Sequence, residues 1–464
     1  MLHLLLSAPL LEWAKLHGAW VSDSVDIRPT PYGGRGVYAT TDISTDTELV
    51  RLPSHLQLGV TSLAEGADAE LQELARSLPP RELRFLPCAV ALCGEMRKGA
   101  SSIFDTYIQE LPATYSNAIA PCDGFGNDPS DERYDEPSSL AWEPTMAAQA
   151  TSMRRAVRLL HESSAPDSLA LRDLCWASAA VCSRSLTRRR VRELTDEELG
   201  RVGEYASKDR TRLLPVIDLV NHAIPSSDAN ADVRHLNLFA QRQSTPTAGL
   251  KFDRLSTSLI TTREVHAGEE LLLDYAAGIY LDGHLPDQKA LLDFGFVLPL
   301  RPDYMASLPL ESRLPPPTVA TEEAKYLRIL LSGVRKQVEP GPLRFGVEGE
   351  PSVATLALAL AFTFQGPEDL ARLVETVEGA PEDLPEAELL EVIVESSTVA
   401  QVEHALGVLA AAAEAALAEI QAAPHPPDKS MDSGASFDRA SREYFDIVCE
   451  MLQRVAEGGP RDAA

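Results

Sequence analysis

An apolar run that ends in polar residues constrains this chain more than any other feature. Residues 213–222 read Leu-Leu-Pro-Val-Ile-Asp-Leu-Val-Asn-His. Polar side chains on an apolar segment are costly to bury unless they form hydrogen bonds, so Asp218, Asn221 and His222 are candidate site residues. Residues 213–220 carry a strand signal. The alternative is a strand or helix end closed by an ordinary Asn-His turn.

Hydrophobic periodicity divides the chain into a core, an insertion and a lobe. Strand-like alternation over residues 20–60 gives way to a helical period at about 68–210, and strand signals return at 233–239, 257–262 and 269–275. The pattern predicts an α+β fold, with a β-rich core in residues 1–300, a helical insertion at about 68–210, and an all-α C-terminal lobe in residues 318–464. The helices predicted in that lobe cover 321–335, 351–365, 366–378, 386–395, 398–423 and 437–457.

The chain is acidic, with 42 basic and 69 acidic residues and a net charge of −27. This charge argues against broad binding of a nucleic-acid backbone, which needs a basic surface. A basic segment of another protein suits an acidic surface better. We expect a protein partner rather than a nucleic acid, and a monomeric chain.

Cysteine usage argues against a disulfide framework and against a metal site. The six cysteines form no Cys-x-x-Cys pair, which indicates buried thiols in a reducing compartment. His222 has neither a His-x-x-x-His neighbour nor paired cysteines beside it, so we expect no bound metal.

No membrane or targeting segment is expected. No uninterrupted apolar run reaches the roughly 18 residues of a membrane span. The apolar start of the chain is short and leads into an amphipathic helix at residues 10–18, which leaves little room for a signal peptide. We expect a soluble, intracellular protein; cytoplasm, nucleus and plastid are not distinguished.

Several short segments lie far apart in the chain: Gly33-Gly34-Arg35-Gly36, Ser183-Arg184, Asn221-His222, Leu271–Tyr275 and Phe294-Gly295-Phe296. Taken alone, each segment has a simpler structural interpretation. The glycines at 33–36 suit a hairpin turn, Arg184 a contact with a helix dipole, and Tyr275 a place in the core. Together they resemble the SET-domain methyltransferases, in the branch typified by the plant Rubisco large-subunit lysine methyltransferase and the actin-histidine methyltransferase. The resemblance covers about residues 8–300.

The resemblance implies a SET core that binds S-adenosyl-L-methionine. Glycines lack the Cβ that would keep a backbone away from a ligand, so the glycine segment would contact the cofactor through its backbone. Arg184 would meet the cofactor carboxylate as a charge-assisted pair, and the Asn-His pair would bind adenine and the amino-acid end. The implied cofactor-binding set is Gly33, Gly34, Arg35, Gly36, Arg184, Asn221, His222, Tyr275 and Phe294.

By the same resemblance, Tyr275 is the expected catalytic residue, with its hydroxyl pointing at the methyl group and the target nitrogen. A lysine with an ordinary pKa of about 10.4 must lose its proton before attack, and burial beside a positive sulfur lowers that pKa. A dedicated general base is then not required. Arg188, Asp218 and Phe296 are the expected substrate-binding residues, and the helical lobe is expected to help dock a protein substrate.

The segment after Tyr275 departs from the family pattern. The family follows its tyrosine with an Arg/Lys-Ser-Asn stretch that opens a helix, whereas residues 276–287 contain extra residues and no such asparagine. Tyr280 in this loop is a second candidate for the catalytic role. We expect a protein-lysine N-methyltransferase. The alternatives are a protein-histidine N-methyltransferase and a non-catalytic SET scaffold that binds protein partners.

Overall fold

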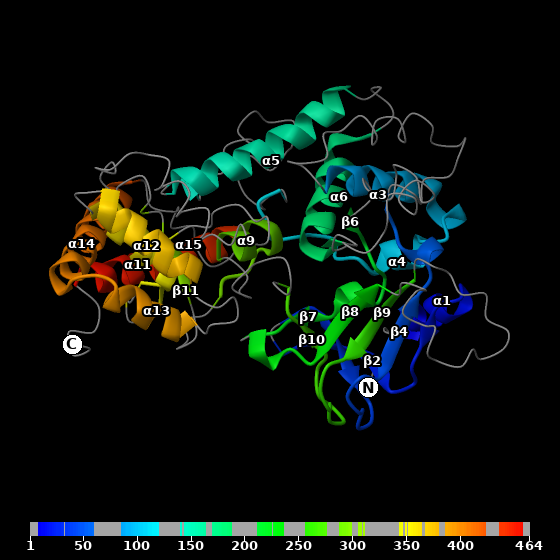
Figure 1. The fold of residues 1–464 in the computed structure, drawn as a ribbon. Coiled ribbons are helices and arrows are strands. Elements are labelled where there is room, and N and C mark those ends of the chain that lie inside the picture. The colour runs from blue at the N-terminus through cyan, green and yellow to red at the C-terminus, as the bar shows by residue number, and fades with distance from the viewer. Residues whose placement is uncertain are drawn as a thin grey trace, which may run out of the picture. The chain divides into compact units, whose positions relative to one another are not determined.

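The chain divides into two compact units (Figure 1). The first contains Met1–Asp135, Ala150–Ile279 and Asp293–Gly295, and the second contains Glu136–Gln149, Tyr280–Leu292 and Phe296–Ala464. The computed structural model describes residues 8–31, 33–59, 85–119, 140–141, 143–163, 169–187, 211–224, 226–235, 256–275, 287–298, 305–308, 310, 343–346, 349, 351–363, 367–379, 386–423 and 436–457.

A six-stranded mixed sheet is the frame of the first unit. β4, β9 and β8 pair antiparallel, whereas β10 pairs parallel with β7. Two smaller pairs join β2 (Val25–Pro29) to β3 (Arg35–Ala39) and β5 (Leu186–Thr187) to β6 (Thr211–Arg212). The order in the sheet is β1 (Trp20–Val21), β4 (Glu48–Leu52), β9 (Thr257–Thr261), β8 (Ala231–His235), β10 (Leu272–Leu273) and β7 (Asn221–His222). The sheet therefore joins strands that precede and follow the helical segment in sequence.

The strand predicted over 213–220 is wrong. Leu213 forms only an isolated bridge with Leu58, and a 3₁₀ turn follows over Ile217–Leu219. Pro215 has no N–H to donate to a ladder, and Val216 has a φ of 74° that no strand contains. The strand predicted over 269–275 is likewise limited to β10. The predicted residues 236–239 lie outside the described ranges.

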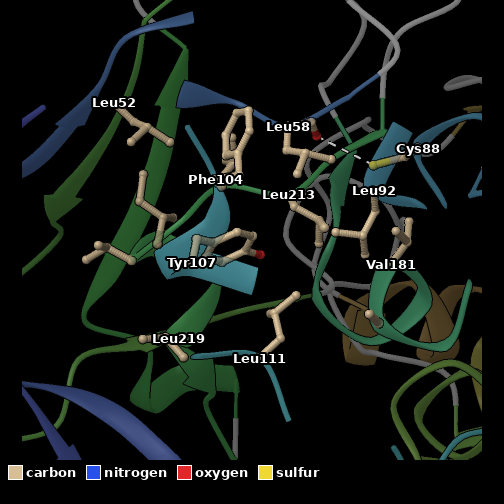
Figure 2. Packing of buried hydrophobic residues seen from close by; sticks show 14 of the residues in the cluster. Leu52, Leu58, Cys88, Leu92, Phe104, Tyr107, Leu111, Val181, Leu213 and Leu219 are labelled. Atoms are coloured by element: carbon tan, nitrogen blue, oxygen red, sulfur yellow. Dashed lines mark hydrogen bonds between the residues drawn. The ribbon is translucent and has the colours of Figure 1, made fainter. Parts of the chain in front are cut away.

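One helix before the first strand, α1, and the helices between β4 and the later strands supply much of the first unit's core. Pro87 lies in the first turn of α3, where its missing N–H leaves no helical hydrogen bond unmade. α3 packs against α6, and α1 packs against α4. Their apolar residues join those of the strands in one cluster (Figure 2). The helices are α1 (Ala8–Leu16), α3 (Leu86–Lys98), α4 (Asp105–Glu110), α5 (Pro144–Ser163) and α6 (Leu171–Arg184).

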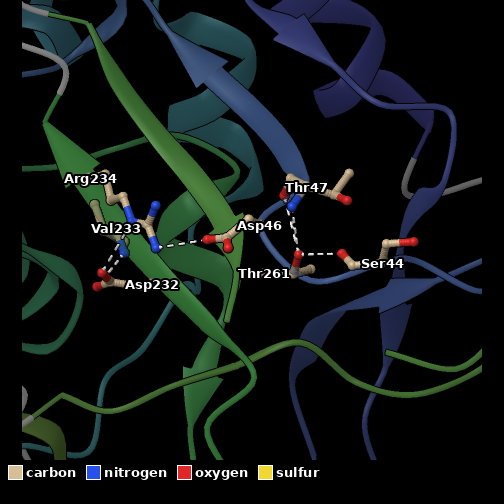
Figure 3. Close-up of polar contacts among 7 residues, drawn as sticks. All are labelled: Ser44, Asp46, Thr47, Asp232, Val233, Arg234 and Thr261. Atoms are coloured by element: carbon tan, nitrogen blue, oxygen red, sulfur yellow. Dashed lines mark hydrogen bonds and ion pairs between the residues drawn. The ribbon is translucent and has the colours of Figure 1, made fainter. Parts of the chain in front are cut away.

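Polar side chains fix the turn that leads into β4. The Thr261 hydroxyl donates to the backbone oxygen of Ser44 at 2.8 Å and accepts from the Thr47 amide at 2.9 Å (Figure 3). Asp46 has a φ of 56°, which aspartate tolerates better than most residues, and accepts from Arg234 at 3.2 Å. These contacts connect the turn to β8 and β9.

The described part of the second unit consists of helices and the β11–β12 pair. Together with the sheet of the first unit, it confirms the α+β class of the chain. α14 packs against α11 and α15, and α13 contacts α11 and α12. The predicted helix over 321–335 lies outside the described residues; the other predicted helices of the lobe are present. The elements are α9 (Asp287–Lys289) with a π-helical turn at Ala290–Phe294, β11 (Met305–Leu308), β12 (Leu343–Gly346), α11 (Val353–Thr363), α12 (Pro367–Gly379), α13 (Glu386–Glu395), α14 (Val399–Ala422) and α15 (Ser436–Ala456).

Within the described ranges, α14 is the one helix long and apolar enough to cross a membrane. Thr398 begins it with a capping box to Gln401, and exposed glutamates occupy one side. The buried residues recur at helical spacing on the other side, as in a helix packed within a bundle. They are Ala405, Leu409, Ala412, Ala413, Ala416 and Ile420.

Candidate active site

The glycine segment forms a hairpin turn whose second half enters β3. Gly33 and Gly34 have φ values of 97° and 76°, a left-handed conformation that strains residues with a Cβ. The Thr30 amide donates to the backbone oxygen of Gly34 at 3.2 Å and closes the turn. Arg35 and Gly36 were predicted as turn residues and are instead the first residues of β3. Backbone conformation thus explains the glycines at 33 and 34.

Gly36 is required for lack of space rather than for backbone conformation, because neighbouring side chains occupy the position that its Cβ would take. An added Cβ would overlap the Glu270 carboxylate and lie 3.0 Å from Nδ2 of Asn221. Asn221 Nδ2 donates to Glu270 Oε1 at 2.7 Å and to the backbone oxygen of Arg35 at 3.1 Å. The Arg35 guanidinium forms an ion pair with Glu110 at the end of α4. The glycine segment is therefore linked both to Asn221 and to α4.

A strained turn carries Asp218 into the interior of the first unit. Fully buried Val216 has φ 74° and ψ −50°, a conformation that is costly for a β-branched residue. The Asp218 amide donates to the backbone oxygen of Leu214 at 2.9 Å and starts the 3₁₀ turn. Such strain persists only where surrounding contacts fix the backbone, and it concentrates at functional sites.

Parallel pairing of β7 and β10 places Tyr275 beside His222. The register aligns Leu273 with His222, two residues before Tyr275. The Tyr275 amide donates to His222 Nδ1 at 3.3 Å, and the two ring centroids are 5.1 Å apart. The Tyr275 hydroxyl donates to the backbone oxygen of Val220 at 2.9 Å. Tyr275 therefore points at the residue immediately before Asn221.

Burial keeps both rings of this pair neutral. It lowers the pKa of His222, so the imidazole carries no charge at neutral pH. It raises the pKa of Tyr275 above its ordinary value of 10.0, so the phenol stays protonated. The Phe294 ring packs against Tyr275 with a centroid distance of 5.0 Å. Tyr275 thus presents a neutral hydroxyl from an aromatic, mostly apolar surrounding.

The segment at 115–119 holds the chain around Phe294 in place. Gly295 has a φ of 75°, and a Cβ there would overlap the backbone oxygen of Ser116. The Asn117 side chain, fully buried, donates from Nδ2 to the backbone oxygens of Ala179 at 2.8 Å and Asp293 at 3.0 Å. The Asn117 side-chain amide thus connects α6 to the residue that precedes Phe294.

A cluster of buried and half-buried polar side chains lies within electrostatic range of Tyr275. The Tyr107 hydroxyl of α4 donates to Asp218 Oδ2 at 2.6 Å. Arg184, at the end of α6, donates from Nη1 to the backbone oxygen of Asp218 at 3.3 Å, and its guanidinium lies 6.0 Å from the centre of the Tyr115 ring. The cluster therefore combines a carboxylate, a guanidinium and phenols in the interior.

Three atoms of this cluster, Asp218 Oδ1, Arg184 Nε and the Tyr115 hydroxyl oxygen, are buried and have no hydrogen-bond partner among the described residues. Buried polar atoms are almost always bonded, so such a group of atoms indicates a place for a ligand or a water. Burial raises the pKa of Asp218 to about 6, although Arg184 and the Tyr107 hydrogen bond oppose the rise. Asp218 is therefore ionised at neutral pH beside a permanent cation.

The structure brings most of the predicted residues together, and it adds others. Gly33 and Gly34 remain in the exposed turn, Phe296 belongs to the second unit, and Arg188 and Tyr280 lie outside the described residues. Tyr107 and Glu110 fall in residues 104–112, Phe-Asp-Thr-Tyr-Ile-Gln-Glu-Leu-Pro, whose aromatic residues and Leu-Pro ending are the only sequence signal for them. The predicted site residues that contact one another, or lie within electrostatic range of one another, are Arg35, Gly36, Arg184, Asp218, Asn221, His222, Tyr275 and Phe294. The residues that join them without having been predicted are Tyr107, Glu110, Tyr115, Asn117 and Glu270.

Gly295→Ala is expected to lower the free energy of unfolding of the first unit by about 2 kcal/mol or more, because the left-handed φ alone costs an L-residue about 1–2 kcal/mol and the Ser116 backbone cannot yield easily. The matched control is Gly407→Ala in α14, where an added Cβ meets nothing within 4 Å. That variant should be neutral or more stable by up to about 1 kcal/mol. Urea unfolding measures both, and equal midpoints for Gly295→Ala and wild type would contradict the expectation.

Comparison with known proteins identifies the fold. No protein-family model and no curated protein matches the sequence. Solved structures do match: the SET domain of LSMT bound to lysine and AdoHcy (16% identity, TM-score 0.55), the same domain bound to MeLysine and AdoHcy (16%, 0.56), and Rubisco LSMT bound to AdoMet (15%, 0.54). Each match covers 97% of this chain and 90% of the other. The chain therefore has the SET-domain fold of the LSMT structures, as the resemblance in its sequence predicted.

Proposed function

We propose that this protein is an S-adenosyl-L-methionine-dependent protein N-methyltransferase that acts on a lysine side chain. The observation that supports it best is the meeting of Asn221, Arg184, Asp218 and Tyr275, which come from three segments far apart in the chain, in one unit. The LSMT structures that share the fold are described as bound to AdoMet or AdoHcy, and some also to lysine or methyllysine. These descriptions favour the same cofactor and substrate class here.

The residues present suit the polar groups of that cofactor. Arg184 Nε is buried and has no hydrogen-bond partner in the part of the chain that the structure describes. It suits a carboxylate, with which a guanidinium forms a charge-assisted hydrogen bond. The Gly33–Gly36 hairpin and Asn221 are the proposed partners of the remaining polar groups, and Phe294 that of an apolar surface. When bound, the cofactor would supply a methyl group on a positively charged sulfur, which a nitrogen lone pair displaces in line.

Tyr275 is proposed to orient the target nitrogen and to accept weak hydrogen bonds. A phenol has one proton, and Tyr275 donates it to the Val220 backbone oxygen. The lone pairs of its oxygen are therefore left as acceptors for N–H or polarised C–H groups. Because burial keeps the phenol protonated, Tyr275 does not act as a general base. The amine is instead proposed to lose its proton to solvent, because burial and the positively charged sulfur of the cofactor lower its pKa against the opposing effect of the Asp218 carboxylate.

The proposed substrate is a protein. Asp218, ionised at neutral pH, would attract the positively charged side chain, with Arg188 and Phe296 as further proposed contacts. The helical lobe over 318–464 is proposed to dock the substrate protein. The net charge of −27 favours a basic segment as the docked partner. We also propose that the chain acts as a soluble monomer inside the cell.

Calorimetry with S-adenosyl-L-methionine, followed by transfer of a labelled methyl group to a protein array, tests the proposal. The expected result is saturable cofactor binding and label on lysine residues, located by mass spectrometry. Label on histidine would replace lysine as the target. Cofactor binding without any labelled protein would favour the non-catalytic scaffold, and absence of binding would reject the proposal.

A further inference from the structure

We propose that Tyr107 is a positioning residue, which fixes the Asp218 carboxylate so that Oδ1 receives the ammonium group of the incoming side chain. The inference rests on the proposed function and deepens it. Tyr107 lies outside the glycine, Asn-His and Tyr275 motifs, in residues 104–112, whose sequence resembles an aromatic-rich motif of the same family that ends in Leu-Pro.

Tyr107 gives Asp218 a single defined orientation. A carboxylate has two equivalent oxygens, and it rotates freely unless one of them is held. Tyr107 holds Oδ2 through a hydrogen bond of 2.6 Å, while Oδ1 is buried with no partner in the described part of the chain. Burial raises the pKa of the Tyr107 phenol well above its ordinary value, so the phenol keeps its proton at neutral pH and can donate this hydrogen bond.

The Tyr107 ring is itself held rigidly. It is 1% exposed and stacks on Trp13 of α1 with a centroid distance of 6.4 Å and an interplanar angle of 21°. Trp13 in turn donates from Nε1 to the backbone oxygen of Ile103 at 2.8 Å. Figure 2 shows Tyr107 among the apolar residues of the core, with Phe104 and Leu219 nearby. The hydroxyl is therefore placed by a fixed ring.

The surroundings of Asp218 favour a cationic ligand at Oδ1 only while the carboxylate is ionised. The charged or titratable groups facing it are Arg184 from α6, Arg35 from β3, Tyr107 from α4, and the phenols of Tyr115 and Tyr275. The two arginines and the Tyr107 hydrogen bond stabilise the ionised form against burial. Removing the Tyr107 hydroxyl should therefore raise the pKa of Asp218 and shift ligand binding to higher pH.

Binding of Nα-acetyl-lysine methylamide, measured by ligand-observed NMR between pH 5 and 8 with S-adenosylhomocysteine present, tests the inference. The probe keeps its ammonium over this range. Wild-type affinity should fall as the pH drops through about 6. Tyr107→Phe should bind about tenfold more weakly at pH 7, the effect of losing one charge-assisted hydrogen bond, and its midpoint should lie at higher pH.

Two further variants separate positioning from a structural role. Asp218→Asn should bind the probe weakly and without pH dependence, and Tyr107→Phe added to Asp218→Asn should cause no further loss, because Tyr107 acts only through Asp218. Tyr444→Phe in α15 removes a hydroxyl from another buried tyrosine and should leave probe binding unchanged. Equal losses from Tyr107→Phe in both backgrounds would overturn the inference.

The outcomes for the inference and for the proposed function are distinct. Wild-type methyl transfer together with an unshifted binding profile in Tyr107→Phe would overturn the role of Tyr107 and leave the enzyme intact. Probe binding with the expected pH shift, but no methyl transfer to any protein, would leave the role of Tyr107 and reject the enzyme. Failure of wild type to bind the probe would overturn the inference.

Discussion

Tyr275→Phe is expected to reduce kcat by about 100-fold or more, the usual effect of removing one preorganised polar group that acts in the transition state. Cofactor affinity should change little, because the aromatic ring that packs on His222 and Phe294 is retained. The hydroxyl is the only atom lost. Single-turnover methyl transfer and calorimetry on the same preparations measure the two quantities separately.

The physical basis of this prediction is the hydrogen bond to Val220. The Tyr275 proton is used by the backbone oxygen of Val220, so the phenol oxygen has fixed lone pairs that cannot rotate away from the reacting groups. In the phenylalanine variant the acceptor is lost, and the Val220 oxygen loses its donor. The dependence of kcat on pH should keep its shape, because a phenol that stays protonated takes no part in it.

Tyr280→Phe provides the comparison for Tyr275→Phe, because Tyr280 is the other tyrosine that the sequence places near the expected position. Tyr275→Phe should lose turnover and Tyr280→Phe should retain it. The opposite result would move the orienting role to Tyr280. Loss of cofactor binding in Tyr275→Phe would show that the tyrosine is structural rather than catalytic.

The sequence predicted the fold where hydrophobic periodicity was regular. Buried residues alternate along β2 and recur at helical spacing along α14, as the periodicity predicted. β4 and β9 also lie where strands were predicted, although most of their residues are buried and do not alternate. The segment 213–220 failed for a local reason: an apolar run fills a buried turn as readily as a buried strand. Only Pro215 signalled that the ladder could not continue, and the left-handed Val216 has no signature in the sequence.

The site was predictable in its motifs and not in its pairings. Asn221, His222 and Tyr275 carry the resemblance, and parallel pairing of β7 with β10 brings them together. The bond from Tyr107 to Asp218 joins residues 111 positions apart on different elements. Neither residue's type or spacing indicates that the other will be its partner. The sequence likewise gives no sign that a Cβ at position 36 would overlap the Glu270 carboxylate, because only coordinates show where that Cβ would fall.

Arg184→Met is expected to weaken cofactor binding by about 100-fold, as truncating one partner of a buried charge pair costs about 2–5 kcal/mol. Methionine retains much of the apolar volume of the arginine stem, so packing should change less than charge. Arg184→Lys should have an intermediate effect, because lysine keeps the charge and loses the planar fork. Calorimetry with S-adenosylhomocysteine measures all three dissociation constants.

The same variants decide between two roles for Arg184. If the arginine only compensates the dipole at the end of α6, Arg184→Met should lower stability by about 0.3–1 kcal/mol and leave cofactor affinity unchanged. If it holds the cofactor, affinity should fall and Asp218 should also lose its strongest stabilising charge. The pKa of Asp218 would then rise above about 6, and binding of a lysine probe should shift to higher pH in Arg184→Met but not in Arg184→Lys. A drop in cofactor affinity without that shift would mean that Arg184 and Asp218 act independently.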